Sequence, residues 1–428
     1  MTKVAIVGAG SLVFTRTIVS DLLQHEATAD AEIHLVDIDA GRLDAAVRAV
    51  ELVGSRLGRK LTPVASTECA TGVGGCDYVV NSIQVGGKSA TLIDFDLPEK
   101  YGVRQTIADT HGIGGISRAL RTVPPVLEIS RVVAEVAPDA LILNYTNPMA
   151  MVVMALAAES GPRHVGLCHG TEHTIDTIAS MLGIDRSEIA WQAAGINHMT
   201  WLLELSRHGV DLYEDLRALA RSADLEHHEE SVRLELLRRF GYFVSESSVH
   251  NAEYYAWFLR PGVPVPNGVR VREYLYRLDD LEREFTLEQS AADDGEVRPP
   301  EPPSDEYAPQ VIAALEENRT YRFMGNVANE GAMVVNLPTN CCVEVPCFVD
   351  GRKIVPGVVG AIPEQCAALN RSAVNVQLLA VQGILTRNRD AIYQAALVDP
   401  LLSTQLTTDE TVALVDELID AHGNPAGL

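Results

Sequence analysis

A cysteine and a histidine in separate segments have the chemistry of a divalent-metal site. Cys168 lies in the segment VGLCHG and His198 in the segment GINHMTW. A thiolate and an imidazole are favoured ligands of transition metals, and an ion with open coordination positions polarises a substrate oxygen. Taken singly, the cysteine could be an inert core residue and the histidine part of a hydrogen-bonded turn. The neighbouring His169 and Asn197 favour the metal site.

A glycine turn near the start of the chain has the chemistry of a dinucleotide site. Gly8, Gly10 and Ser11 end the run VAIVGAGS. The first glycine permits a tight turn, the second lets a pyrophosphate approach the backbone, and the N-terminus of a following helix attracts the negative charge. Val13 occupies the third glycine position of the G-x-G-x-x-G pattern, so a strand–helix turn without a ligand is the alternative.

Two polar residues at later strand ends are predicted to complete the cofactor site. Asp37 ends the run EIHLVDID, where a carboxylate accepts hydrogen bonds from a ribose 2′-hydroxyl and repels a 2′-phosphate, so NAD is favoured over NADP. Asp39 could take this role instead, or cap the next helix. Asn81 ends the run DYVVN. A chain with both sites could oxidise a substrate carbon and polarise the resulting ketone.

Short apolar runs alternate with helical stretches over the first 170 residues. Strands are expected at 3–8, 32–39, 77–83, 140–148 and 164–170, and helices at about 13–24 and 40–57. That alternation is typical of a doubly wound parallel sheet, in which the strand carboxyl ends share one ligand-binding edge. We therefore expect an α/β fold with a Rossmann-like NAD-binding domain over 1–195. An α+β domain over 196–428, similar to the C-terminal half of lactate and malate dehydrogenases, is expected to hold metal, substrate and oligomer contacts.

The second half of the chain has a different pattern. We expect two strands flanking a loop at 189–205, helix with a charged, solvated face at 212–240, strands at 334–350 and helices at 363–420. The acidic, proline-rich segment 286–307 is predicted to be a surface excursion or loop.

Composition excludes some classes of partner. The chain has 428 residues, enough for two or three structural units, and a formal net charge of −24, which disfavours nucleic acid because phosphate binding needs a basic surface. No apolar run is long enough to span a bilayer, so no membrane partner is expected. No N-terminal secretion signal is visible, and the seven cysteines lack the spacing of a disulfide scaffold. A cytoplasmic location is therefore predicted.

Several motifs together resemble glycoside hydrolase family 4 over nearly the whole chain. They are GAGS, IADT, RALRT, NYTNPMA, GLCH, AGINHMTW, GYFVSESSVHNAEYYAWF, NLPTNCCVEVPCFVD and the C-terminal segment NVQLLAVQGILTRNRDAIYQAALVDP. The chain is most similar to the α-galactosidase (melibiase) branch. The resemblance implies catalysis with NAD⁺ and a divalent metal, usually Mn²⁺, without net oxidation. Hydride leaves sugar C3, a base removes the C2 proton, the aglycone is eliminated, and water and the hydride then add back. A homodimer or homotetramer acting on a small glycoside is expected.

The resemblance also implies roles for individual residues. Cys168 and His198 are implied metal ligands, and His169 matches a position that holds the acid catalyst in some branches. For the C2 base, Tyr254 is the first choice and Glu246 and His250 are rivals. Predicted site residues with less specific roles are Asp109 as a catalytic residue and Asn147 and Arg118 as substrate-binding residues. Arg118 and Arg121 could form an anion clamp or lie at a helix start.

One residue departs from the melibiase pattern. That branch typically has serine after Cys-His, whereas this chain has Gly170, as do members that act on α-glucosides or α-uronosides. The phospho-glycosidase branches typically have Asn or Asp in the place of His169. We therefore expect a non-phosphorylated α-hexoside, with an α-galactoside as first choice. An NAD-dependent hydroxyacid dehydrogenase and a non-catalytic NAD(H) sensor are the alternatives from other classes.

Overall fold

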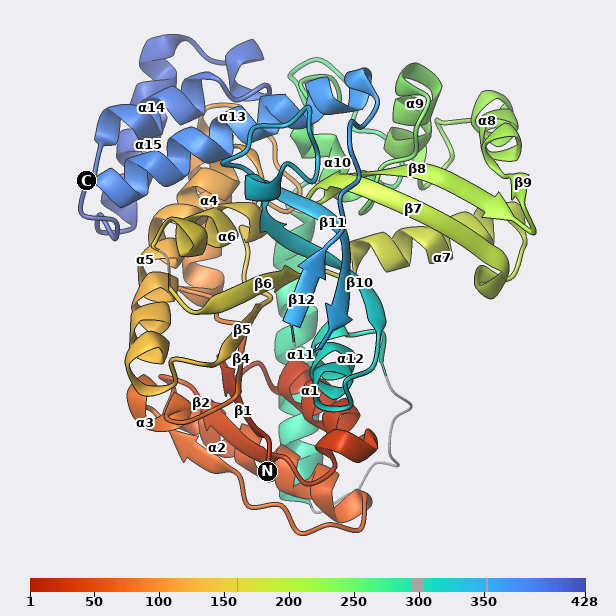
Figure 1. Cartoon of the computed structure of the whole chain (residues 1–428). Coiled ribbons are helices and arrows are strands. Elements are labelled where there is room, and N and C mark those ends of the chain that lie inside the picture. The colour runs from red at the N-terminus through yellow and green to blue at the C-terminus, as the bar shows by residue number, and fades with distance from the viewer. Residues whose placement is uncertain (160, 295–303, 352) are drawn as a thin grey trace.

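Six parallel strands form one half of a large sheet in the computed structural model, which describes residues 1–159, 161–294, 304–351 and 353–428 (Figure 1). Their order is β3-β2-β1-β4-β5-β6. All but β3 are short, mostly apolar runs that are largely buried, as parallel strands require, whereas β3 at the sheet edge is mostly exposed. Their bounds are β1 Lys3–Val7, β2 Glu32–Val36, β3 Val64–Ser66, β4 Tyr78–Asn81, β5 Leu141–Asn144 and β6 Arg163–Leu167.

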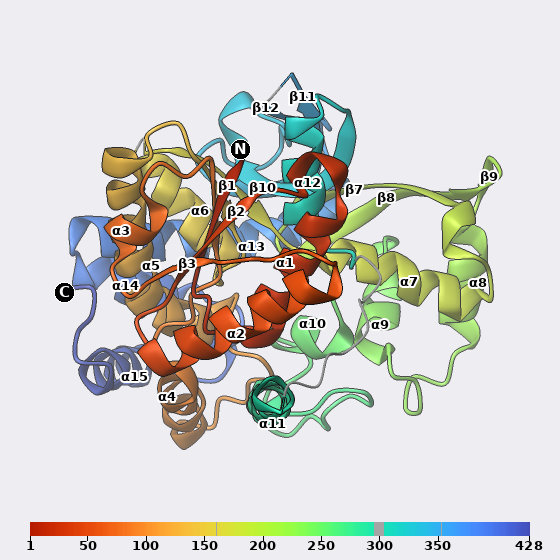
Figure 2. The ribbon, with the colours of Figure 1, turned by 90° about the horizontal axis from the view of Figure 1, so that it is seen from below.

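Helices cover both faces of these strands (Figure 2). Ile6 and Leu35 pack with residues of α1 and α2, whereas Val7 and Val36 pack with α3 and the C-terminal part of α5. This alternation of successive side chains between the two faces confirms the predicted doubly wound arrangement. The helices are α1 Leu12–Gln24, α2 Ala40–Arg56, α3 Cys69–Val73, α4 Gly87–Lys100, α5 Gly112–Val136, α6 Met149–Ala158 and α7 Gly170–Leu182.

Antiparallel strands extend the same sheet beyond β6. Strand β10 pairs with β6, and the order continues β10-β11-β7-β8-β9, with β12 beside β11. The predicted domain boundary at residue 195 therefore falls inside β7, and the division into two domains stays a prediction. The bounds are β7 Ile189–Ile196, β8 Met199–Arg207, β9 Val210–Asp211, β10 Tyr321–Ala328, β11 Cys342–Asp350 and β12 Lys353–Pro356.

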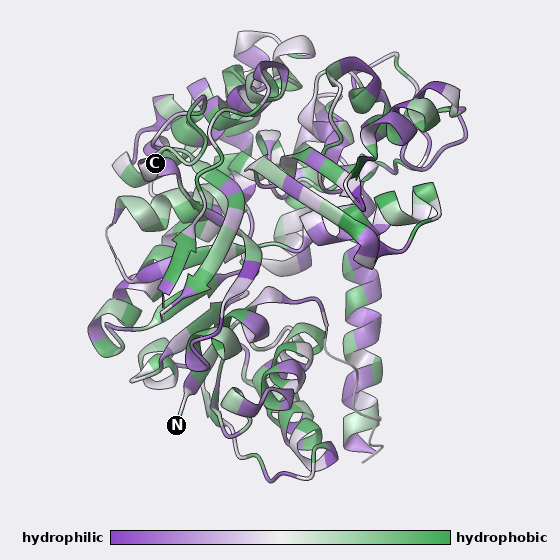
Figure 3. Cartoon of the chain, turned by 45° about the vertical axis from the view of Figure 1, so that its right-hand side comes forward, coloured by the Kyte–Doolittle hydropathy of each residue, from purple (hydrophilic) through white to green (hydrophobic). Residues whose placement is uncertain are grey.

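The later helices return to the first half of the chain. Helices α11 and α12 pack against α1, and α13 packs against α5 and α6. Figure 3 shows α11, at the right, as a long helix in which hydrophilic and hydrophobic residues alternate, while the strands of the sheet are more hydrophobic. No helix of the described residues is long and apolar enough to cross a membrane. The bounds are α8 Tyr213–Ser222, α9 Ser231–Phe240, α10 Ser248–Tyr254, α11 Glu273–Asp293, α12 Tyr307–Glu316, α13 Glu364–Thr386, α14 Arg389–Leu397 and α15 Thr408–Ala421.

Three predicted stretches differ from the structure. The helix expected over 212–240 is two helices, α8 and α9, separated by a turn-rich segment. The expected loop 286–307 begins within α11, and residues 295–303 lie outside the described residues. Only the second part of 334–350 is a strand, because the amide of Asn329 satisfies the carbonyl groups of Val334, Leu337 and Pro338 in place of a neighbouring strand.

Candidate functional site

The predicted functional residues follow the ends of neighbouring parallel strands. Gly8 comes directly after β1, Asp37 after β2 and Cys168 after β6, while Asn81 is the last residue of β4. Because the strands are parallel, these positions share the carboxyl edge of the sheet. The sheet thus brings the glycine turn and the cysteine to the same side of the molecule.

The glycine turn is held closely against its neighbours. Gly8 has φ +90°, and a Cβ there would lie 2.9 Å from the backbone nitrogen of Ile83. At Gly10 a Cβ would lie 2.7 Å from Oδ2 of Asp37. Ser11 precedes α1 without making a capping hydrogen bond, so the helix N-terminus remains available to an anion. These features fit a bound pyrophosphate.

Asp37 and Asp39 have separate tasks. Oδ2 of Asp37 accepts a hydrogen bond from the backbone N–H of Gly10 at 2.7 Å, which fixes the carboxylate beside the turn, where a ribose would lie. Asp39 accepts the N–H groups of Gly41 and Arg42 and caps α2. Asn81 is buried, and its amide donates to Oδ1 of Asn144 at 2.8 Å, while its own Oδ1 has no hydrogen-bond partner among the described residues.

Cys168, His198 and Glu246 bring three potential ligand atoms within 4.8 Å of one another. His198 lies in the two-residue turn between β7 and β8 at φ +62°, and Glu246 has φ +71°. A left-handed conformation costs a residue other than glycine roughly 1–3 kcal/mol, so both positions are held by their surroundings. Hydrogen bonds from Leu202 to Phe243 and from Ser245 to Thr200 fix the segment before Glu246 along β8.

This donor set is chemically suited to a transition metal. Burial, with the carboxylates of Glu344 and Glu246 nearby, raises the pKa of the Cys168 thiol well above its usual value. A thiolate therefore needs a cation beside it. Burial opposes ionisation of Glu246, but His250, His198 and Arg233 outweigh it and hold its pKa at about 2. A sulfur, a nitrogen and an oxygen ligand fit Mn²⁺ or another divalent ion.

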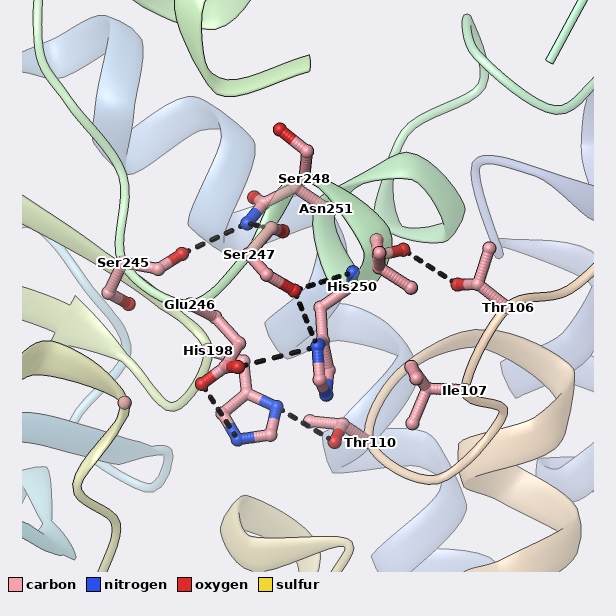
Figure 4. A network of polar contacts seen from close by, with 12 residues as sticks. Thr106, Ile107, Thr110, His198, Ser245, Glu246, Ser247, Ser248, His250 and Asn251 are labelled. Carbon is pink, nitrogen blue, oxygen red and sulfur yellow. Dashed lines mark hydrogen bonds and ion pairs between the residues drawn. The ribbon is translucent and has the colours of Figure 1, made fainter. Parts of the chain in front are cut away.

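His198 is hydrogen-bonded on the side away from Glu246 (Figure 4). Its Nδ1 lies 3.0 Å from Oγ1 of Thr110 and 3.1 Å from the hydroxyl of Tyr254, and its Nε2 lies 3.9 Å from Oε2 of Glu246. Tyr254 is buried, which raises its pKa well above the usual value of a phenol. His250 lies 3.4 Å from Glu246, so all three candidates for the C2 base surround His198.

Asp109 and Asn147 form a second polar pair next to His198. Nδ2 of Asn147 donates to Oδ2 of Asp109 at 3.0 Å, and Thr110 donates to Oδ1 at 2.7 Å. Burial opposes ionisation of Asp109, but Arg118 and the nearby histidines outweigh it and lower the pKa of this carboxyl. A ligand atom of Asp109 also lies within 4.8 Å of those of His198 and His250, which makes a second candidate metal group.

Two other predicted residues have protein partners. His169 is partly exposed, and its Nδ1 lies 3.3 Å from Oε1 of Glu306, whose hydrogen bond raises the pKa of the imidazole. Arg118 is buried between Asp109 and the ring of Tyr274. By contrast, Arg121 forms a two-point salt bridge with Asp94, and both arginines lie in the first turns of α5, so of the two alternatives the helix start fits and the anion clamp does not.

Supporting residues that sequence patterns did not identify surround this centre. Gln377 donates to Nδ1 of His111 at 3.1 Å, so Nε2 of His111 donates to the carbonyl of Asn197 and fixes the turn that carries His198. Glu253 accepts three backbone N–H groups of residues 106–108 and so fixes the loop before Asp109. Their positions inside the motifs ADTHG and AEYY were the available signal.

A parallel-sheet edge with an open glycine turn beside a thiolate–imidazole–carboxylate group defines a dinucleotide- and metal-binding class of enzyme. Comparison with known protein families identifies the family within this class. The family model "Family 4 glycosyl hydrolase" matches residues 3–184 and its C-terminal domain matches residues 193–402. The chain belongs to the family 4 glycosyl hydrolases.

Known relatives align over the full chain. An α-galactosidase of Bacillus subtilis is 38% identical over 99% of both chains, and an α-galactosidase of Rhizobium meliloti is 33% identical over 98% of this chain and 88% of the relative.

Solved structures agree on the fold. The lplD protein of Bacillus subtilis has a TM-score of 0.88 at 27% identity, covering 98% and 99% of the two chains. A 6-phospho-α-glucosidase from gut microorganisms, solved with NAD and Mn²⁺, has a TM-score of 0.82 at 21% identity, covering 99% and 98%. Malate dehydrogenase of Plasmodium falciparum has a TM-score of 0.52 at 14% identity, covering 92% and 100%, in line with the expected dehydrogenase-like fold.

Proposed function

We propose that this protein is an NAD⁺- and Mn²⁺-dependent α-glycosidase whose first-choice substrate is a non-phosphorylated α-galactoside. The observation that carries the proposal is the grouping of Cys168, His198 and Glu246 on the same sheet edge as the glycine turn. Two relatives that align with nearly the whole chain are α-galactosidases, which supports the choice of sugar. Family membership favours this function over the hydroxyacid dehydrogenase and sensor alternatives.

Both cofactors have residues suited to hold them. A relative in fold binds NAD and Mn²⁺. In this chain Gly8, Gly10, Ser11, Asp37 and Asn81 would hold NAD, and Cys168 and His198 would hold the metal. When bound there, NAD⁺ would supply the acceptor for the hydride from sugar C3, and the metal would supply a Lewis acid that makes the neighbouring C2–H acidic.

The chain's own residues would position the sugar and move protons. The hydrogen bond from Asn147 to Asp109 orients its amide, leaving the amide oxygen to accept from a sugar hydroxyl. Arg118 keeps Asp109 ionised. Tyr254 is our candidate for the base at C2, and His169, paired with Glu306, is our candidate for donating a proton to the leaving oxygen.

Gly170 has an explanation that does not depend on the sugar. A Cβ at this position would lie 2.2 Å from Oε2 of Glu246, so the glycine makes room for that carboxylate. The missing serine is therefore no argument by itself for an α-uronoside or α-glucoside.

The choice of substrate is tested by measuring hydrolysis of a panel of p-nitrophenyl α-galactoside, α-glucoside, α-glucuronide and α-galacturonide. Preference for the galactoside is expected, and preference for a uronide would contradict the choice of substrate.

A cytoplasmic homodimer or homotetramer belongs to the same proposal. Exposed apolar side chains on and beside β11 and β12, Phe348, Val355 and Val358, offer a surface for contact between copies. Light scattering coupled to size-exclusion chromatography is expected to give two or four times the mass of one chain. A monomer at micromolar concentration would contradict the proposed oligomeric state.

A further inference from the structure

We propose that Glu246 is the third protein ligand of the metal ion held by Cys168 and His198. This inference rests on the proposed function for the presence of a metal, and assigns a role to a residue that the comparisons leave unassigned. The potential ligand atoms of the three residues lie within 4.8 Å of one another.

The hydrogen bonds around His198 identify which nitrogen is available. The carboxylate of Asp109 has no proton to donate, so Thr110 gives its hydroxyl hydrogen to Oδ1 at 2.7 Å. Oγ1 of Thr110 can then accept from Nδ1 of His198 at 3.0 Å, and the hydroxyl of Tyr254 lies 3.1 Å from the same nitrogen. Because these two hydroxyls engage Nδ1 and orient the ring, Nε2 is the nitrogen left for a metal, an arrangement usual for metal-binding histidines.

The available nitrogen faces Glu246. Nε2 lies 3.9 Å from Oε2 of Glu246, which is too long for a hydrogen bond. Two ligands that each lie roughly 2.0–2.2 Å from one ion are separated by a distance of this order. Figure 4 shows the two side chains directed toward each other from the turn between β7 and β8 and from the segment before α10.

The carboxylate of Glu246 faces imidazole groups in place of a Lys or Arg side chain. Among the described residues no Lys or Arg side chain forms an ion pair with its carboxylate, since Arg233 donates to the backbone carbonyl of Glu246 and to the side chain of Glu230. The groups that face it are the imidazoles of His250, at 3.4 Å, and His198, at 3.9 Å. A carboxylate that is largely removed from water normally has an ion pair or a metal, so a cation between Glu246 and His198 would complete its surroundings.

The backbone also leaves room for this side chain, because Glu246 has a left-handed φ and residue 170 has no Cβ. A Cβ at Gly170 would lie 2.2 Å from Oε2 of Glu246 and 3.5 Å from Sγ of Cys168, so the oxygen and the sulfur border the same small space. By contrast, Asp109, the carboxylate of the rival group with His198 and His250, already binds Thr110 and Asn147.

The test measures Mn²⁺ binding to the full-length protein without substrate, from the loss of the electron paramagnetic resonance signal of free Mn²⁺. Glu246→Gln is expected to weaken binding by about 100-fold or more, since even residues that only support a ligand change affinity 10–100-fold. Asp109→Asn, which removes the same charge from the rival group, is expected to stay within a few-fold of the unmodified protein. Thermal unfolding of each variant reports folding.

A second pair of variants tests the geometry. Gly170→Ala is expected to weaken Mn²⁺ binding by displacing the Glu246 side chain, and to add no further loss to Glu246→Gln. Equal Mn²⁺ affinity of Glu246→Gln and the unmodified protein would overturn the assignment and leave the glycosidase function standing. A loss of Mn²⁺ affinity confined to Asp109→Asn would instead assign the metal to the rival group of Asp109, His198 and His250. Failure of the unmodified protein to bind Mn²⁺ at all would contradict the proposed function as well.

Discussion

At the scale of single residues, the thiol of Cys168 is the group whose chemistry depends most on its surroundings. It follows a buried strand and lies near the carboxylates of Glu246 and Glu344, which oppose its ionisation. A divalent cation reverses this effect, because coordination favours the thiolate. Substitution of this residue is therefore expected to impair metal binding and turnover, and to leave NAD⁺ binding at the glycine turn after β1 nearly unchanged.

Cys168→Ser is expected to lower kcat for p-nitrophenyl α-galactoside at least about 100-fold, because a hydroxyl is a much poorer ligand than a thiolate. NAD⁺ affinity, measured by calorimetry, is expected to stay within a few-fold. Equal loss of both quantities would indicate a folding defect and contradict this division of roles.

Tyr254→Phe is expected to lower kcat by about 10²–10⁴-fold, the usual contribution of a general base, with Mn²⁺ affinity nearly unchanged. Tyr255 provides a matched control, because it is also a buried tyrosine but its hydroxyl contacts Asn251 instead of His198. Tyr255→Phe is expected to keep most of the activity. A Tyr254→Phe enzyme with nearly full kcat would transfer the role of base to His250, since Glu246 is assigned to the metal.

At the scale of elements, α10 holds the loop that carries Asp109. Glu253, near the end of this helix, accepts the backbone N–H groups of residues 106–108. Burial outweighs these hydrogen bonds and raises its pKa to about 7. The folded protein therefore keeps this carboxyl protonated at pH values where the unfolded chain has already ionised it.

The stability contributed by protonated Glu253 is expected to be complete below about pH 4.5, to fall as pH rises toward 7, and to level off above it, a change of a few kcal/mol. Glu253→Gln lacks this titration. The difference in unfolding midpoint between the two proteins should therefore shrink from pH 4.5 to 7 and stay constant from pH 7 to 8. Parallel curves throughout would show that Glu253 does not titrate in this range.

Strands and helices could be predicted from the sequence better than contacts between residues far apart in the chain. Strand–helix alternation placed β1, β2 and β4–β6 to within a few residues, because short apolar runs ending in Gly or Asp are a local signal. It also placed Cys168 and His198 as candidates. The contacts of Glu253 with residues 106–108, and of Gln377 with His111, join positions over 140 residues apart, so no local pattern could indicate them. The break between α8 and α9, at 223–230, was not predicted from the sequence. The charged run EHHEE that it contains is also typical of a solvated helix face, so it gave no signal for a turn.

At the scale of the whole molecule, the two halves of the chain share one sheet. Strand β10 completes the edge of β6, and α13 covers α6, whose residues Met149–Leu156 are all buried. A fragment of residues 1–195 would expose this apolar helix and an unpaired strand edge.

That fragment is therefore expected to aggregate or to unfold without cooperativity, and to bind NAD⁺ at least about tenfold more weakly than the full chain. Circular dichroism during heating and NAD⁺ calorimetry would measure both properties. A soluble fragment with cooperative unfolding and unchanged NAD⁺ affinity would show that residues 1–195 form an independent domain.

The central claim is that the glycosidic bond breaks by elimination after oxidation at C3, with the candidate base and metal ligands grouped around Cys168, at the sheet edge that also carries the cofactor turn. Its most direct test is hydrolysis of an α-galactoside deuterated at C2, with NAD⁺, Mn²⁺ and a thiol reductant present. The account predicts that the released sugar has exchanged its C2 deuterium for solvent hydrogen, and that cleavage stops when NAD⁺ is omitted or the metal is chelated. Complete retention of deuterium in the product would contradict it.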